Sequence, residues 1–171
     1  ALQIYSEVGR GSTVKLYLPV SKASNAPRPE VSDAEIAPVA KGQRVLVVED
    51  QPEVRSHVEK LLTKAGYEVT SAENALAALA LLEAGEVFDL LFTDVIMPGG
   101  MNGVQLASDA VRILPDMKVL FTSGFPASAF AEVGVHAWEG FDLLQKPYKA
   151  MDLITAVNAS GMAGQTAGLP K

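Results

Sequence analysis

Three carboxylates, one hydroxyl and one amine stand directly after short apolar segments of this sequence. They are Glu49, Asp50, Asp94, Thr122 and Lys146. Three carboxylates in one place would repel one another, and one or more would take up a proton unless a cation lay among them. A small set of hard oxygen ligands suits Mg2+, while a lysine and a hydroxyl suit an anionic oxygen. Together these groups predict phosphoryl transfer onto an aspartate, where catalysis is mostly positioning and charge neutralisation.

The spacing of these residues predicts that they meet in the fold. Intervals of 44, 28 and 24 residues separate Asp50, Asp94, Thr122 and Lys146, and they equal two, one and one strand–helix repeats. In an open doubly wound sheet, the ligand site lies beyond the carboxyl ends of the strands. We therefore expect the five side chains at one edge of a sheet.

Short apolar runs alternate with amphipathic stretches over most of the chain. The predicted strands are Arg44–Val48, Phe88–Thr93, Lys118–Phe121, Phe141–Gln145 and, more weakly, Tyr67–Ser71. The predicted helices lie between Pro52 and Gly66, over Ala75–Ala84 behind an Asn74 cap, over Val104–Leu114, in a short segment after Pro126, and over Ala150–Ala159. Strands that are continuous in hydrophobicity and alternate with helices predict an α/β fold with a parallel sheet covered on both faces.

Composition narrows the function classes. The 171 residues include no cysteine, which excludes disulfides and thiolate metal sites. The net charge of -6 arises between residues 43 and 160, which carry eight basic and sixteen acidic residues. Such an acidic segment argues against nucleic acid as a partner, because phosphate neutralisation needs clustered Lys and Arg. No apolar run is long enough to span a membrane, so we expect no membrane contact.

Four segments are expected along the chain. Residues 1–20 end in an alternating stretch, Ser12–Val20, that predicts a half-buried strand stopping at Pro19. Residues 21–42 mix Ser, Ala, Pro and charges without periodicity and predict a flexible linker. Residues 43–160 hold the α/β domain, and residues 161–171 are expected to be a disordered tail.

Residues 43–160 resemble the response-regulator receiver domains of two-component signalling. The resemblance rests on four motifs in order: VLVVED at Val45–Asp50, FTDVIMPGGMNG at Phe92–Gly103, VLFTSGF at Val119–Phe125 and LLQKPY at Leu143–Tyr148. It implies a flavodoxin-like doubly wound (βα)5 fold with a five-stranded parallel sheet in the order 2-1-3-4-5. It also implies a phosphorelay function, in which a phosphoryl group passes from phosphohistidine to an aspartate and switches partner contacts.

The resemblance also assigns roles to individual residues. Asp94 would be the phosphoacceptor, carrying an aspartyl phosphate, and Lys146 would pair with the phosphoryl group. Thr122 would report phosphorylation by moving toward it, and Pro147 would follow a cis peptide bond. The Mg2+ ligands would be Glu49, Asp50, Asp94 and the backbone carbonyl of Ile96.

Two departures from the family pattern bear on switching. Met97–Gly103 carries one extra residue, which lengthens the loop beside the site. Leu143 stands three residues before Lys146, where the family usually has the switch aromatic. Phe141, two residues earlier, lies on the same strand face but starts from a different depth. The signal of phosphorylation is therefore expected to reach a partner either through Leu143 and Phe141 or through shifts of the backbone and the loop.

A second resemblance lies upstream. Ser6–Thr13, followed by the strand Val14–Leu18, is similar to the last glycine box and final strand of the ATP-binding domain of sensor histidine kinases. Residues 1–20 would then be the remnant of that domain, and the chain would be the C-terminal piece of a hybrid histidine kinase. The parent would be a histidine kinase, whereas this piece would catalyse only its own aspartyl phosphorylation and dephosphorylation.

The resemblance also implies partners for the chain, and one alternative function stays open. The expected partners are the phosphohistidine of a cognate kinase dimerisation domain and a histidine phosphotransfer protein, with a monomeric chain in the cytoplasm. The alternative function is a receiver-like interaction module that works without phosphorylation. A dinucleotide-binding oxidoreductase is excluded because Glu49–Pro52 has no glycine fingerprint. A two-aspartate phosphomonoesterase would need a carboxylate at Ile96.

Overall fold

The chain forms two separate units, residues 1–34 and 35–171. The computed structural model describes residues 2–18, 40, 42–98, 100–124 and 141–162. The predicted linker, except for Ala40 and Gly42, the C-terminal tail beyond Met162, and the helix expected after Pro126 lie outside these residues.

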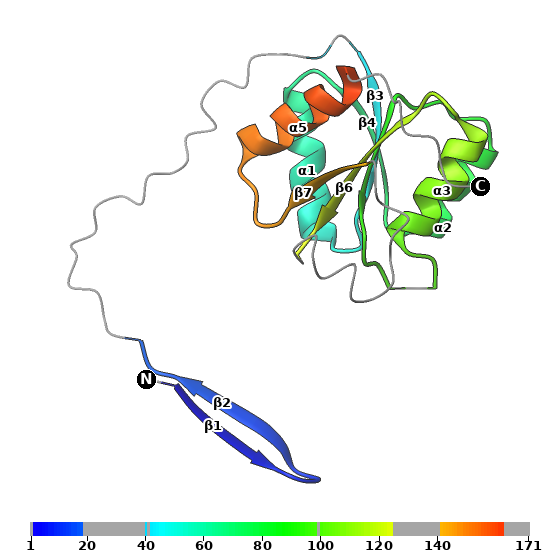
Figure 1. Ribbon diagram of the computed structural model, residues 1–171. Coiled ribbons are helices and arrows are strands. Elements are labelled where there is room, and N and C mark those ends of the chain that lie inside the picture. The colour runs from blue at the N-terminus through cyan, green and yellow to red at the C-terminus, as the bar shows by residue number, and fades with distance from the viewer. Residues whose placement is uncertain (1, 19–39, 41, 99, 125–140, 163–171) are drawn as a thin grey trace, which may run out of the picture. The chain divides into compact units, whose positions relative to one another are not determined.

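The larger unit is built on a five-stranded parallel sheet (Figure 1). Its strands are β3 (Arg44–Val48), β4 (Glu68–Ala72), β5 (Leu90–Asp94), β6 (Lys118–Ser123) and β7 (Asp142–Gln145). They lie in the order β4-β3-β5-β6-β7, which confirms the predicted order 2-1-3-4-5. Register along β5 and β6 places Asp94 opposite Thr122.

Four described helices cover the two faces of the sheet. They are α1 (Pro52–Lys64), α2 (Ala75–Glu83), α3 (Gly103–Ile113) and α5 (Ala150–Met162). Figure 1 shows α1 and α5 on one face and α2 and α3 on the other. Each face has its own apolar core: Val47, Phe92 and Leu120 belong to the α1/α5 core, and Leu91 and Phe121 to the α2/α3 core. Among the described residues, no helix combines the length and hydrophobicity that a membrane crossing needs.

Local sequence signals set the helix ends. Pro52 occupies the first turn of α1, and Gly66, with φ of 95°, follows its end in the left-handed conformation that glycine favours. The predicted Asn74 cap is confirmed, since its side chain accepts a hydrogen bond from the Ala77 N–H. Asn102 and Gln105 form a capping box that starts α3 immediately after the loop beside the site.

The described part of the smaller unit contains a hairpin of β1 (Leu2–Glu7) and β2 (Gly11–Leu16), which pair antiparallel. The predicted strand over Ser12–Val20 is therefore present but shorter, and the expectation that it is half-buried is wrong. Every residue of both strands is exposed, because a two-stranded ribbon has no second layer to cover either face.

Candidate functional site

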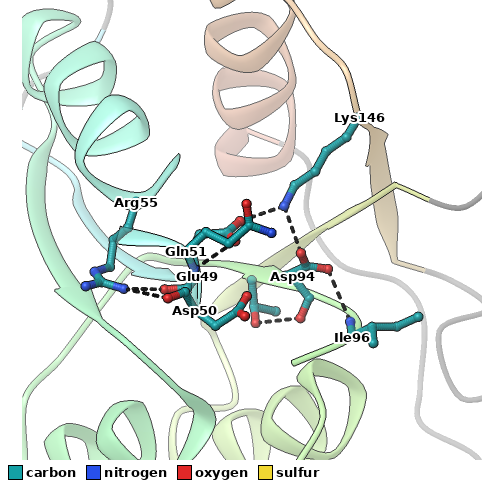
Figure 2. Close-up of polar contacts among 8 residues, drawn as sticks. Glu49, Asp50, Gln51, Arg55, Asp94, Ile96 and Lys146 are labelled. Atoms are coloured by element: carbon teal, nitrogen blue, oxygen red, sulfur yellow. Dashed lines mark hydrogen bonds and ion pairs between the residues drawn. The ribbon is translucent and has the colours of Figure 1, made fainter. Parts of the chain in front are cut away.

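Three carboxylates gather at the carboxyl edge of the parallel sheet. Glu49 and Asp50 follow β3, and Asp94 ends the neighbouring strand β5 (Figure 2). One oxygen from each residue lies within 4.8 Å of the others. Glu49 is fully buried, whereas the Asp94 side chain remains 12% exposed and so accessible from outside. Three hard oxygen donors at this spacing fit a divalent cation such as Mg2+.

Lys146 closes the cluster from the end of β7. Its Nζ lies 2.6 Å from Glu49 Oε2 and 2.8 Å from Asp94 Oδ2. The Lys146 backbone N–H donates to the Ser123 carbonyl at 2.7 Å, and the Lys146–Pro147 peptide bond is cis. In Figure 2 the lysine side chain reaches the two acids from a separate strand. The Lys146 ammonium group therefore bridges Glu49, which is buried, and Asp94, which ends β5.

The pKa values of Glu49 and Lys146 reflect both burial and ion pairing. Burial raises the pKa of Glu49 above its usual value, with Lys146 opposing the rise and Asp94 adding to it. Burial alone would lower the pKa of Lys146, but its hydrogen bonds and ionic contacts with Asp94 and Glu49 outweigh burial and raise it. The lysine therefore stays charged, which is the state that can pair with an anionic oxygen.

Arg55, on α1, fixes the loop that carries the first two acids. One guanidinium nitrogen donates to the Glu49 carbonyl at 2.6 Å and approaches the Asp50 carbonyl at 3.5 Å (Figure 2). The Gln51 N–H donates to Glu49 Oε1 at 3.4 Å. Sequence reasoning missed Arg55. The available signal was its place on the first helix, one turn after the acids.

The backbone around Asp94 is held equally closely. The Oδ1 atom of Asp94 accepts a hydrogen bond from the Ile96 N–H at 3.2 Å, and the backbone carbonyl of Asp94 accepts one from the Thr93 hydroxyl at 3.1 Å. A Cβ built on Gly103 would lie 2.0 Å from the Asp94 carbonyl oxygen, so only glycine fits there without displacement. Gly103 was not among the predicted site residues, although it closes the loop motif.

Strand alternation separates Thr122 from the residues expected to couple to it. Leu120 belongs to the α1/α5 core and Phe121 to the α2/α3 core, so Thr122 faces α1 and α5 and Ser123 faces the other side. Leu143 and Phe141 pack against the α2/α3 core, with the Phe141 ring edge-on to Phe121 at 5.6 Å. Thr122 thus does not share a face with Phe141 or Leu143.

Ser123 is a buried hydroxyl that the sequence prediction omitted. It lies at the carboxyl end of β6, on the same side of the sheet as Phe121 and Leu143. Register places it opposite Gln145, directly before Lys146. The alternation of the VLFTS segment could have identified it, because every second residue faces the same core.

The sheet order and the acidic edge bridged by lysine define a receiver-type α/β domain. Residues 45–158 match the family model described as the response regulator receiver domain, and the chain belongs to this family. The domain acts as a phosphoacceptor in two-component signalling.

Relatives and solved structures agree with this assignment. The response regulator receiver protein CpdR of Brucella abortus is 38% identical over 115 residues, covering 67% of this chain and 93% of that protein. The sensor kinase CckA of the same organism is 35% identical over 160 residues, covering 89% of this chain but only 17% of that protein. A receiver protein from Sinorhizobium medicae superimposes with a TM-score of 0.64 at 30% identity, covering 72% of this chain and 97% of that one. The receiver domain of the hybrid histidine kinase CckA gives 0.58 at 34% identity, covering 70% and 99%.

Proposed function

We propose that Asp94 is the residue that accepts the phosphoryl group, and that the donor is a phosphohistidine of a cognate kinase. The observation that carries the proposal is the Asp94 carboxylate, 2.8 Å from Lys146 Nζ and grouped with the Glu49 and Asp50 oxygens. A carboxylate oxygen of Asp94 attacks phosphorus, and the P–N bond of the donor breaks. Its electron pair returns to the imidazole nitrogen, and the product is an acyl phosphate on Asp94.

The surrounding residues have distinct tasks in this proposal. Glu49, Asp50 and Asp94, with the Ile96 carbonyl, would hold Mg2+, which when bound neutralises charge on the transferred group. Lys146, already charged beside Asp94, pairs with a phosphoryl oxygen. Thr122, opposite Asp94 in the sheet, supplies a hydroxyl donor.

The alternative, an interaction module that works without phosphorylation, is less well supported. Glu49 is fully buried, and its pKa is raised by burial and by Asp94. Holding a buried acid beside two further carboxylates destabilises a fold. A domain that never bound a cation or an anion at this edge would gain nothing from that arrangement.

Replacing Asp50 by Asn is expected to weaken Mg2+ binding at least about tenfold, the lower range seen even for residues one shell further from a metal. The measurement is a Mg2+ titration followed by amide shifts of Asp94 and Lys146, repeated with beryllofluoride as the phosphoryl mimic. Glu53→Gln is the matched control, because Glu53 is an exposed acid in the first turn of α1, outside the cluster. Equal affinity in the Asp50→Asn variant and the wild type would reject the metal site.

A second part of the proposal concerns residues 1–20. We propose that the β1–β2 hairpin is the end of a histidine-kinase ATP-binding domain and that the chain is the C-terminal piece of a hybrid kinase. The match to CckA covers 89% of this chain, against 67% for CpdR, and so extends beyond the receiver domain. The hairpin exposes apolar side chains that a complete domain would cover: Leu2, Ile4, Tyr5, Val14 and Leu16.

The hairpin of this chain is therefore expected to show almost no protection in amide hydrogen exchange. Two strands alone are marginally stable in water, whereas β3, β5 and β6 are buried. Exchange measured by NMR or mass spectrometry on the whole chain compares the two units directly. Protection of Ile4 and Val14 comparable with that of Val47 would mean that the hairpin needs no further domain.

The remaining parts of the proposal follow from a kinase donor. A cytoplasmic location follows because a histidine kinase needs ATP, and a monomeric receiver leaves the Asp94 edge accessible. A histidine phosphotransfer protein is the proposed second partner, since an acyl phosphate can pass its phosphoryl group to another histidine.

A further inference from the structure

Arg55 makes contacts of a different kind from those of the other described arginines. Its guanidinium group donates to the backbone carbonyl of Glu49 at 2.6 Å and approaches that of Asp50 at 3.5 Å. The other arginines in the described part of the chain pair with carboxylates: Arg10, Arg44 and Arg112. Glu49 and Asp50 supply two of the three clustered carboxylates. Arg55 thus lies beside the acidic cluster but contacts its backbone.

Helix α1 holds Arg55 in place. The Arg55 N–H donates to the Gln51 carbonyl at 2.9 Å, in the first turn of the helix. Further along the same helix, Val58 and Leu61 are buried in the α1/α5 core. The Arg55 side chain is itself half-buried. The packing of α1 on the sheet therefore sets the position of the guanidinium group relative to the end of β3.

The backbone of Glu49 is held from two directions. Its N–H donates to the Ala72 carbonyl, at the end of β4, at 3.3 Å, and its carbonyl accepts the hydrogen bond from Arg55. A hydrogen bond from a charged donor is shorter and stronger than one between neutral groups. Because the peptide groups on both sides of the Glu49 Cα are fixed, the direction in which the side chain leaves the backbone is fixed too.

Arg55 lies away from the place where a phosphoryl group would be added. In Figure 2 the segment of Glu49 and Asp50 lies between Arg55 and Asp94, and Lys146 lies on the Asp94 side. The charge of Arg55 opposes the binding of a cation in the cluster, because like charges repel each other. If charge were its only effect, Arg55 would weaken Mg2+ binding.

We propose that Arg55 is a positioning residue for the cation site and strengthens Mg2+ binding in spite of its charge. By holding the Glu49 and Asp50 carbonyls on the α1 side, it turns both carboxylates toward Asp94. This inference rests on the proposed Mg2+ site. Mg2+ demands near-ideal octahedral geometry, whereas Ca2+ accepts irregular arrangements of oxygen ligands. A loop held by Arg55 therefore favours Mg2+ over Ca2+.

The first test replaces Arg55 by Met, which keeps an unbranched apolar stem but has neither the charge nor the donors. Mg2+ binding is expected to weaken about tenfold, as for other partners that orient metal ligands. The measurement is a Mg2+ titration of the whole chain, followed by the amide shifts of Asp94 and Lys146. Arg55→Lys, which keeps the charge and can donate to one carbonyl, is expected to recover part of the affinity. Lys60→Met is the matched control, because Lys60 is an exposed cation of the same helix, and it is expected to bind Mg2+ like the wild type.

The second test separates positioning from a purely structural role. The same titrations are repeated with Ca2+, and the affinity of Arg55→Met for Ca2+ is expected to fall less than its affinity for Mg2+. The ratio of the Mg2+ affinity to the Ca2+ affinity is therefore expected to decrease. A lower melting temperature without any cation would accompany the loss of the hydrogen bond to Glu49, but it would not change this ratio.

The outcomes distinguish this inference from the metal site itself. No response of the wild type to Mg2+ would overturn both. Mg2+ binding in the wild type, with equal or tighter binding in Arg55→Met, would keep the site and overturn the positioning role. An equal loss of affinity for both ions would also overturn it, since Arg55 would then support the loop without setting its geometry.

Arg55→Lys decides the question if Arg55→Met does not fold. Wild-type affinity for Mg2+ in Arg55→Lys would overturn the proposal. Weaker Mg2+ binding, with a reduced preference for Mg2+ over Ca2+, would support it.

Discussion

Replacing Asp94 by Asn is expected to reduce phosphoryl transfer from a phosphorylated kinase core on the order of 1000-fold or more, a loss comparable with removal of a nucleophile elsewhere. The amide keeps the shape of the side chain but lacks the anionic oxygen that attacks phosphorus in the proposed reaction. Folding is expected to survive, because Lys146 keeps Glu49 as a partner at 2.6 Å. Repulsion among the three acids also falls in this variant.

The measurement is transfer of labelled phosphate from the kinase core to the wild type and the variant, with Mg2+ present. Asp116→Asn is the matched control, since Asp116 is an exposed aspartate in the turn before β6, at the amino edge of the sheet. It is expected to accept phosphate at the wild-type rate. Undiminished labelling of Asp94→Asn, stable to hydroxylamine, would place the phosphoryl group on another residue.

Replacing Gly103 by Ala is expected to disturb Asp94 without touching its side chain. The added Cβ would lie 2.0 Å from the Asp94 carbonyl oxygen and 3.1 Å from Thr93 Oγ1. The obstructing oxygen belongs to β5, which is paired on both sides by β3 and β6, so the clash cannot be relieved by a side chain alone. We expect the free energy of unfolding to fall by about 1–3 kcal/mol, as for overpacked sites, and phosphoryl acceptance to slow.

Urea unfolding and phosphotransfer on the same samples test both effects. Gly124→Ala is the control, because a Cβ at Gly124 has no atom of the described residues within 4 Å, although Gly124 follows β6 beside the site. Its stability is expected to match that of the wild type. Wild-type stability and transfer in Gly103→Ala would show that α3 can move away from Asp94 at no cost.

The sequence predicted β3 to the residue because its apolar run is continuous and has clear ends. The predicted strand Phe88–Thr93 began two residues before β5 begins and ended one residue before β5 ends. Phe88 is buried like a strand residue, but Asp89 uses its carboxylate to accept the Arg44 N–H at 2.7 Å. A hydrophobic pattern indicates which residues are buried but not which backbone groups form hydrogen bonds. The predicted strand bounds are therefore wrong at the ends. The β1 strand, in which every residue is exposed, was not predicted.

The site was predictable wherever it depends on strand ends. Glu49, Asp50, Asp94 and Lys146 converge because parallel strands bring their carboxyl ends to one edge. To predict on which face of the sheet Thr122 lies, the alternation of side chains has to be followed along β6 and compared with the neighbouring strands. The contacts of Arg55 and Gly103 with backbone carbonyls depend on how helices pack, which spacing alone does not give.

The position of Lys146 at the end of β7 has a mechanical consequence. Asp94 ends the central strand of the sheet, whereas β7 is hydrogen-bonded within the described sheet to β6 alone. A force between Asp94 and Lys146 therefore acts between a strand that is paired on both sides and an edge strand that is paired on one side. We expect charge added at Asp94 to displace the edge strand β7 more readily than the central strand β5.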